Sequence, residues 1–191
     1  MSKKVIGLVL GAMLLALCLP VAAQQPGKIP RIGYLSSGGA SSSPTRDAFL
    51  QGLRELGYVE GKNIVIEYRY ADGKLDRLPG LAAELVRLKV DVLVSSAGNL
   101  SARALQQVTS SIPIVMTMGS DPVAAGLVSS LARPGGIVTG LTSITGDLSG
   151  KRLELLTETM PKLSRVAVIY DPGDPAKITE FKEIQVAAQG L

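Results

Sequence analysis

The stretch RIGYLSSGGASSSPTRDAFLQGLRELG, residues 31–57, decides the fold. Its first five residues, Arg31–Leu35, predict a strand that runs into a loop rich in serine and glycine. Ser43 and Pro44 have the residue types of a helix N-cap and a first helical position. An apolar stripe at helical spacing then ends at Gly57, so the loop leads into an amphipathic helix. A buried strand followed by such a helix is the repeating unit of a parallel α/β sheet.

The same unit recurs along the chain. We expect four more strands in the first 142 residues, at Ile64–Tyr70, Val90–Ser95, Pro113–Met118 and Ile137–Thr142. Helices are expected at 78–88, Asn99–Val108 and Pro122–Leu131. Because these strands are apolar on both faces, helices should cover both sides of the sheet. The prediction is a doubly wound N-terminal α/β lobe over residues 24–142.

Residues 143–191 predict a hinge and the start of a second α/β lobe. The expected elements are a helix at Leu148–Met160, a strand at Arg165–Tyr170 and a helix at Ala176–Gln189. A single strand and helix cannot bury their own apolar faces, so this lobe should be incomplete and the chain a truncated form of something longer. The alternative is that these last elements fold back onto the first lobe.

Composition excludes several kinds of chemistry. The chain has no histidine, and its only cysteine is Cys18. Histidine-based triads, histidine zinc sites and intrachain disulfides are therefore excluded. The glycine-rich dinucleotide motif, the Walker A loop and the nucleophile elbow are also absent. We expect no enzyme, no cofactor and no metal. The net charge of +4 includes Lys3 and Lys4 and is too small to indicate nucleic acid.

The N-terminus predicts an export signal at residues 1–23. Two lysines precede the uncharged stretch Val5–Leu19, and small residues end at Ala23, where cleavage is expected. The mature protein would then be periplasmic. Fifteen apolar residues are fewer than the roughly 20 of a membrane-spanning helix, which disfavours the alternative of a retained anchor. A lipoprotein is also disfavoured, because a bulky leucine precedes Cys18.

Candidate ligand-binding residues follow the strands. Ligands of open α/β sheets bind beyond the carboxyl ends of the strands, where the strand order reverses. Several of the loops there open a helix, and free N–H groups at a helix N-terminus favour a carboxylate or another anion. Asp121 adds an acceptor that suits an ammonium group. The candidate residues are Ser36, Ser37, Ser96, Ala97, Gly98, Asn99, Gly119, Ser120, Asp121 and Asp171.

Purely structural roles are open for several of these residues. Asn99 and Asp121 have the sequence of ordinary helix caps, and Ser36–Ser43 can be a flexible turn. Asp171 lies in a run of aspartate, proline and glycine that is typical of turns.

Seven stretches in a specific order resemble one family. The chain is similar to the periplasmic substrate-binding components of ABC transporters, in the branch related to tryptophan and aromatic amino-acid binders. The stretches are 32–37 (IGYLSS), 49–70 (FLQGLRELGYVEGKNIVIEYRY), 76–86 (DRLPGLAAELV), 111–115 (SIPIV), 121–131 (DPVAAGLVSSL), 133–139 (RPGGIVT) and 151–161 (KRLELLTETMP).

The resemblance implies a two-lobed, type I periplasmic-binding-protein fold with a hinge, and no enzymatic activity. It also implies a small amino-acid-like or carboxylated solute between the lobes, a membrane permease as partner, and a monomer. By position, the loops at Ser36, Ser96 and Asp121 match ligand loops of the family, whereas Ala97 departs from the glycine of many relatives. The alternative is a ligand-sensing module for a membrane receptor; a small α/β enzyme is disfavoured because the chain has no catalytic motif.

Overall fold

The computed structural model describes residues 28–190, apart from 42, 97 and 144–147. The predicted signal at residues 1–23, its cleavage near Ala23 and the question of Cys18 therefore lie outside the described residues, as does Ala97. Within the part of the chain that is described, no helix has the length and apolar character needed to cross a membrane.

A five-stranded parallel sheet forms the larger body of the described residues. Its strand order is β2-β1-β3-β4-β5, so the direction of winding reverses between β1 and β3. The bounds are β1 (Arg31–Ser36), β2 (Val65–Tyr70), β3 (Val92–Ser96), β4 (Ile114–Met116) and β5 (Val138–Gly140). The predicted doubly wound parallel sheet is confirmed, although β4 and β5 are shorter than their sequence patterns indicated.

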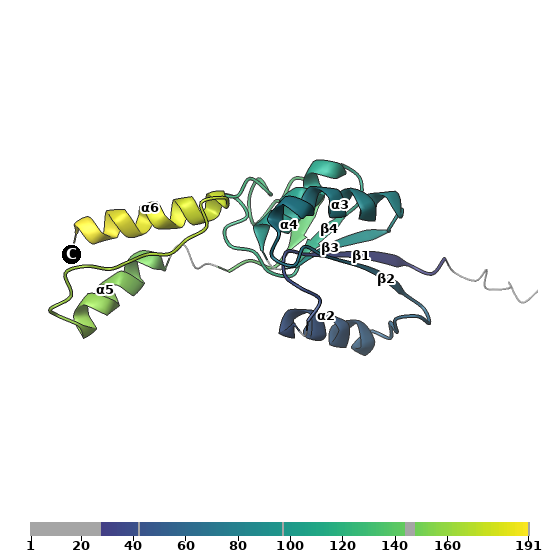
Figure 1. Ribbon diagram of the computed structural model, residues 1–191, viewed down its shortest axis with the longest axis horizontal. Coiled ribbons are helices and arrows are strands. Elements are labelled where there is room, and N and C mark those ends of the chain that lie inside the picture. Colours follow the sequence, from purple (N-terminus) through teal and green to yellow (C-terminus); the bar gives the residue numbers. More distant parts are fainter. Residues whose placement is uncertain (1–27, 42, 97, 144–147, 191) are drawn as a thin grey trace, which may run out of the picture.

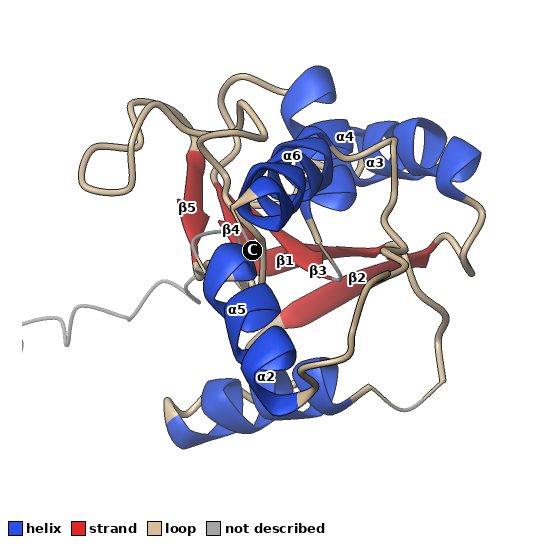
Figure 2. Cartoon of the chain, turned by 90° about the vertical axis from the view of Figure 1, so that its left-hand side faces the viewer, coloured by secondary structure: helices blue, strands red, loops and turns tan. Residues whose placement is uncertain are grey.

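Helices cover both faces of the sheet, as Figure 2 shows. One face carries α3 (Leu78–Arg87) and α4 (Asn99–Val108), which pack against each other and against the strands. The short 3₁₀ helix η1 (Leu75–Arg77) leads directly into α3. The opposite face carries α2 (Pro44–Glu55). Each helix begins close to the carboxyl end of the strand before it, which places the connecting loops at one edge of the sheet.

The core has two parts because successive strand residues point to opposite faces. Leu35 and Leu93 pack with the α3 and α4 side, where Leu85 and Leu105 are also fully buried. A second cluster lies on the α2 side of the sheet and consists of Ile32, Tyr34, Ile64, Ile66 and Val94. Partly buried side chains pack against it: Phe49, Leu50, Leu53, Tyr68 and Tyr70.

The predicted helix at Pro122–Leu131 is wrong. The segment makes a single turn, in which Ala125 N donates to Asp121 O at 3.0 Å. Gly126 then has a φ of +69°, a left-handed conformation that ends helical structure. The aspartate, the proline and the apolar stripe are helix signals, but this glycine stops the helix after its first turn.

The second, smaller body contains α5 (Ser149–Thr159) and α6 (Pro175–Gln189), which pack side by side away from the sheet (Figure 1). The predicted strand at Arg165–Tyr170 is wrong: this segment has no strand hydrogen bonding, and Ile169 is fully exposed. A strand exists only through its ladder with a neighbour. None of the described strands runs beside this segment, so its apolar residues stay in an extended, unpaired chain.

Candidate functional site

The carboxyl ends of β1 and β3 bring two predicted site residues together. Ser36 and Ser96 are directly opposite each other in the parallel register, and both are buried. Ser36 Oγ accepts a hydrogen bond from Gly38 N at 3.1 Å, which shapes the loop after β1. Burial raises the pKa of the Tyr34 phenol above its ordinary value. A hydrogen bond with the side chain of Ser96 opposes this rise but does not cancel it. The strand reversal point is therefore lined by small hydroxyl groups.

Asn99 joins the loop after β4 to the start of α4. Its Nδ2 donates to Ser120 O at 2.6 Å, and its Oδ1 accepts from Ser120 N at 3.3 Å. Gly119 must be a glycine for this packing, because a Cβ there would lie 2.8 Å from Asn99 Oδ1. Gly98 precedes the helix with a φ of +107°, which also favours glycine. Asn99, Gly119 and Ser120 are therefore in direct contact, and Gly98 is the residue just before Asn99.

Two further hydroxyl residues hold the same loop from the β5 side. Gly119 O accepts from Ser143 N at 2.8 Å, from Ser143 Oγ at 3.2 Å and from Thr142 Oγ1 at 3.3 Å. On the other side, Ser101 Oγ lies 2.7 Å from Ser95 Oγ and donates to Ser96 O at 3.0 Å. These bonds fix the backbone of the loops that carry the candidate residues.

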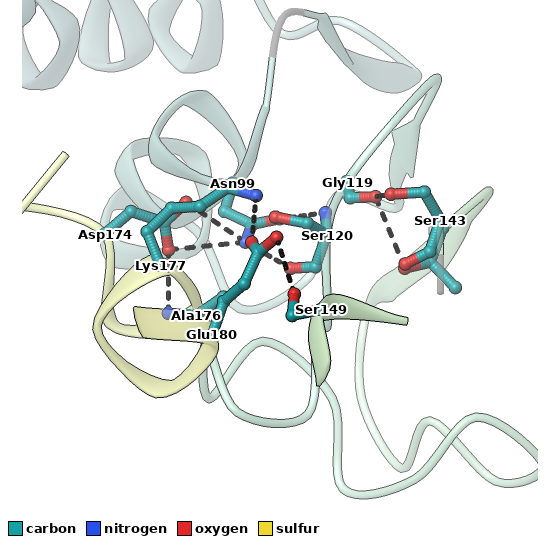
Figure 3. A network of polar contacts seen from close by, with 10 residues as sticks. Asn99, Gly119, Ser120, Ser143, Ser149, Asp174, Ala176, Lys177 and Glu180 are labelled. Atoms are coloured by element: carbon teal, nitrogen blue, oxygen red, sulfur yellow. Dashed lines mark hydrogen bonds and ion pairs between the residues drawn. The ribbon is translucent and has the colours of Figure 1, made fainter. Parts of the chain in front are cut away.

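Asp174, from the second body, reaches this same cluster (Figure 3). It is the N-cap of α6, and its Oδ1 accepts from Ala176 N at 3.0 Å. Asn99 Nδ2 lies 3.4 Å from each of its carboxylate oxygens. The residue is 8% exposed. Asp174 belongs to the run of aspartate, proline and glycine after Asp171 that is typical of a turn; its position before Pro175 is the local signal of a helix cap.

Three candidate residues, Asp121, Asp171 and Ser37, form hydrogen bonds within their own loop or with a neighbouring loop. Asp121 is exposed, with a φ of +37°, and its Oδ1 accepts from Ala124 N at 2.9 Å, as in a helix or turn cap. Asp171 is also exposed, and its Oδ1 accepts from Gly173 N at 2.8 Å, as in an Asx turn. Ser37 O accepts from Gly73 N at 2.9 Å, in the loop beside β2. Ligand roles for these three residues, as for the other candidates, stay predictions.

An aromatic group lies next to Ser36 at the end of β2. Tyr70 is opposite Ser36 in the register, and its ring is stacked with that of Tyr68 at 6.1 Å and an interplanar angle of 5°. Arg46 Nη1 donates to Tyr70 Oη at 3.3 Å and to Ala40 O at 2.9 Å. Burial raises the pKa of Tyr68 well above its ordinary value. Tyr70 is thus fixed at the same edge as the serines.

The second body carries its own aromatic pair. The ring of Tyr170 stacks on Phe181 of α6, with centroids 4.5 Å apart. One face of Tyr170 is therefore already covered within this body. A ligand could stack only on the other face of Tyr170.

This cluster combines polar groups from both bodies. Hydroxyl groups, an amide side chain and the N–H groups at the start of α4 come from the first body, and a buried carboxylate comes from the second. The parallel sheet with helices on both faces is shared with solved type I periplasmic binding proteins, of which the chain covers about half. The family described as ABC transporter substrate binding protein matches residues 37–190, and the chain belongs to this family, whose members are binding proteins and not enzymes.

Individual relatives agree with this assignment. A tyrosine-binding protein of Clostridioides difficile is 35% identical over 134 residues, which is 70% of this chain and 38% of that protein. A conserved domain protein of Vibrio cholerae has 32% identity and a TM-score of 0.76, over 85% of this chain and 54% of the other. A Streptococcus pneumonia ABC domain in complex with L-Trp has 24% identity and a TM-score of 0.71, over 84% and 54% of the two chains.

The chain thus spans about half the length of the solved structures it matches, and a little over a third of the curated relative. Proteins of this family work outside the cytoplasm and bind small solutes for ABC transporters.

Proposed function

We propose that the protein is the extracytoplasmic solute-binding component of an ABC transporter, which binds a small α-amino acid between two lobes and delivers it to a membrane permease. The observation that carries this proposal is the contact of Asn99, which also binds Ser120, with Asp174 of the second body. Export through a signal cleaved near Ala23 and a monomeric state belong to the same proposal.

The chemistry of the site favours a zwitterion with a carboxylate. The N-terminus of α4, which begins at Asn99, offers N–H groups and a partial positive charge to that carboxylate. Ser36 and Ser96 add hydroxyl groups at the neighbouring ends of β1 and β3. Gly98 lets a ligand approach the backbone closely, since no atom of the described residues lies within 4 Å of the position its Cβ would occupy.

Aromatic amino acids are the first ligands to test. The C. difficile relative is named as a tyrosine-binding protein, and the pneumococcal neighbour was solved with L-Trp. In this chain, the fixed ring of Tyr70 beside Ser36 would supply a flat surface for an aromatic side chain.

Calorimetry and thermal shift test the proposal. The mature protein, from residue 24 to the end of its reading frame, is titrated with L-tyrosine, L-tryptophan, L-phenylalanine and L-leucine. A ligand at about 100 times its dissociation constant should stabilise the fold by about 2.7 kcal/mol. Binding by none of these amino acids would refute the proposal.

A pair of variants on α4 tests the site. Asn99→Ala should lower the affinity about tenfold or more, because it removes a side chain at the centre of the contacts. The exposed Gln107, on the same helix, provides the matched control, and Gln107→Ala should bind as the wild type does. Equal affinities for both variants would place the ligand elsewhere. Loss of uptake of the bound amino acid when the gene is deleted would support the transport role.

A further inference from the structure

Asp174 is a buried carboxylate whose charge has no cationic partner among the described residues. The basic side chain next along α6, Lys177, instead pairs with Glu180 at 2.6 Å. Buried charges in proteins are normally paired, because removing an ion from water is costly. What offsets the charge of Asp174 here is the N-terminus of α6 and two neutral N–H donors.

The two donors are unequal. Ala176 N binds Oδ1 at 3.0 Å, a normal hydrogen bond, and it comes from the helix that Asp174 caps. Asn99 Nδ2 lies at 3.4 Å from both oxygens, whereas it lies at 2.6 Å from Ser120 O. The amide of Asn99 is therefore committed mainly to Ser120, and within the described part of the chain Oδ2 of Asp174 has one long hydrogen-bond contact. An ionised carboxylate can accept about four hydrogen bonds, so Oδ2 has unused capacity.

We propose that Asp174 binds the ammonium group of an α-amino acid, which takes the place of the Asn99 amide as donor to Oδ2. The inference rests on the proposed function and names its ligand class. An ammonium gives a charge-assisted bond, which is shorter and stronger than the bond from a neutral amide. The released Nδ2 of Asn99, together with the first N–H groups of α4, then faces the carboxylate of the same ligand.

This placement fits both charges of a zwitterion. The negative group of the site comes from α6 in the second body, and the positive helix end comes from α4 in the first. Asp121, the other acidic candidate near this loop, is exposed, and its Oδ1 is bound to Ala124 N. A buried carboxylate discriminates more strongly than an exposed one, because water does not screen it.

The test compares L-tyrosine with 3-(4-hydroxyphenyl)propionate, the same molecule without its amino group, by calorimetry on the mature protein. The wild type should bind L-tyrosine about 10- to 100-fold more tightly. Asp174→Asn keeps an oxygen for the cap but removes the charge, so it should abolish most of this preference and leave the affinity for the propionate within a few-fold. Glu183→Gln removes an exposed carboxylate from the same helix and should keep the full preference.

The outcomes separate the two proposals. Equal binding of both compounds by the wild type overturns the role of Asp174 but leaves the solute-binding function intact. Binding of neither compound counts against the proposed function itself. If Asp121→Asn removes the preference and Asp174→Asn does not, the ammonium site lies at Asp121 and the inference is wrong. If Asp174→Asn does not fold, the wild type and Asp121→Asn still test the inference: it is overturned if the wild type shows no preference for L-tyrosine or if Asp121→Asn loses that preference.

Discussion

Replacing Gly119 by alanine tests whether the site is as tightly packed as its distances indicate. A Cβ at this position would lie 2.8 Å from Asn99 Oδ1 and 2.9 Å from Met116 Cε. Ordinary contacts of a Cβ begin at about 3.4 Å. Both side chains must therefore move by roughly half an ångström. Met116 has flexible torsions and can yield, whereas Asn99 is held by its two bonds to Ser120.

The cost follows from those two bonds. Each contributes about 1 kcal/mol net, so their loss should lower the free energy of unfolding by about 2 kcal/mol. For a domain of this size, that corresponds to a fall in Tm of roughly 4–8 °C. Because the displaced Asn99 lies at the proposed ligand site, affinity for L-tyrosine should also fall about tenfold.

Urea unfolding followed by circular dichroism measures the first effect, and calorimetry measures the second. Gly136→Ala is the matched control, since nothing lies within 4 Å of a Cβ at that position. The reasoning is refuted if Gly119→Ala unfolds within about 0.5 kcal/mol of the control and binds ligand equally well. That result would mean that the contacts of Asn99 relax without loss.

Two other expectations concern the first lobe. Leu85→Ala should lower the free energy of unfolding in urea by about 2–5 kcal/mol, because Leu85 is fully buried. Leu56 is 76% exposed, so the control Leu56→Ala should change that free energy by less than about 0.5 kcal/mol. Similar values for both variants would contradict the assigned core. Hydrogen bonds from Lys28 Nζ and then from Arg31 N hold the pKa of Asp91 below its usual range. A depressed folded-state pKa stabilises the fold above the unfolded value of about 3.9, and this contribution is lost as the pH falls through the folded-state pKa. The protection of the Arg31 amide against hydrogen exchange should therefore fall below about pH 4, and Asp91→Asn should remove this pH dependence.

The sheet could be predicted because its strands are buried on both faces. Residues such as Leu93 and Val94 belong to the two opposite core clusters, and only a strand between two helical layers needs apolar residues at both positions. The errors arose where structure depends on more than local pattern. Glycine can adopt either a helical or a left-handed conformation, and the left-handed one at Gly126 ends the helix. Arg165–Tyr170 lacks the neighbouring strand with which it would form a hydrogen-bonded ladder.

The position of the two serines could also be predicted from the sheet. Ser36 and Ser96 follow adjacent parallel strands, so their meeting is a consequence of topology. The contact between Asn99 and Asp174 joins residues 75 positions apart in two different bodies. No periodicity or motif in the sequence predicts such a contact. The sequence around Asp174 indicates only a helix cap, and Asp174 does cap α6.

Under the proposed function, that long-range contact gives Asp174 a different energetic role from the serines. A ligand shifts the balance between open and closed lobes only by the difference between its free energies of binding to the two arrangements. Bonds to Ser36 and Ser96 come from one lobe and are available in both arrangements, so they raise affinity without favouring closure. A bond to Asp174 forms together with those only when the second body lies against the first, as it does here through Asn99. If the ammonium group is bound by Asp174, then the amino group of the ligand is also the part that drives closure, and an acid without it should bind to an open protein.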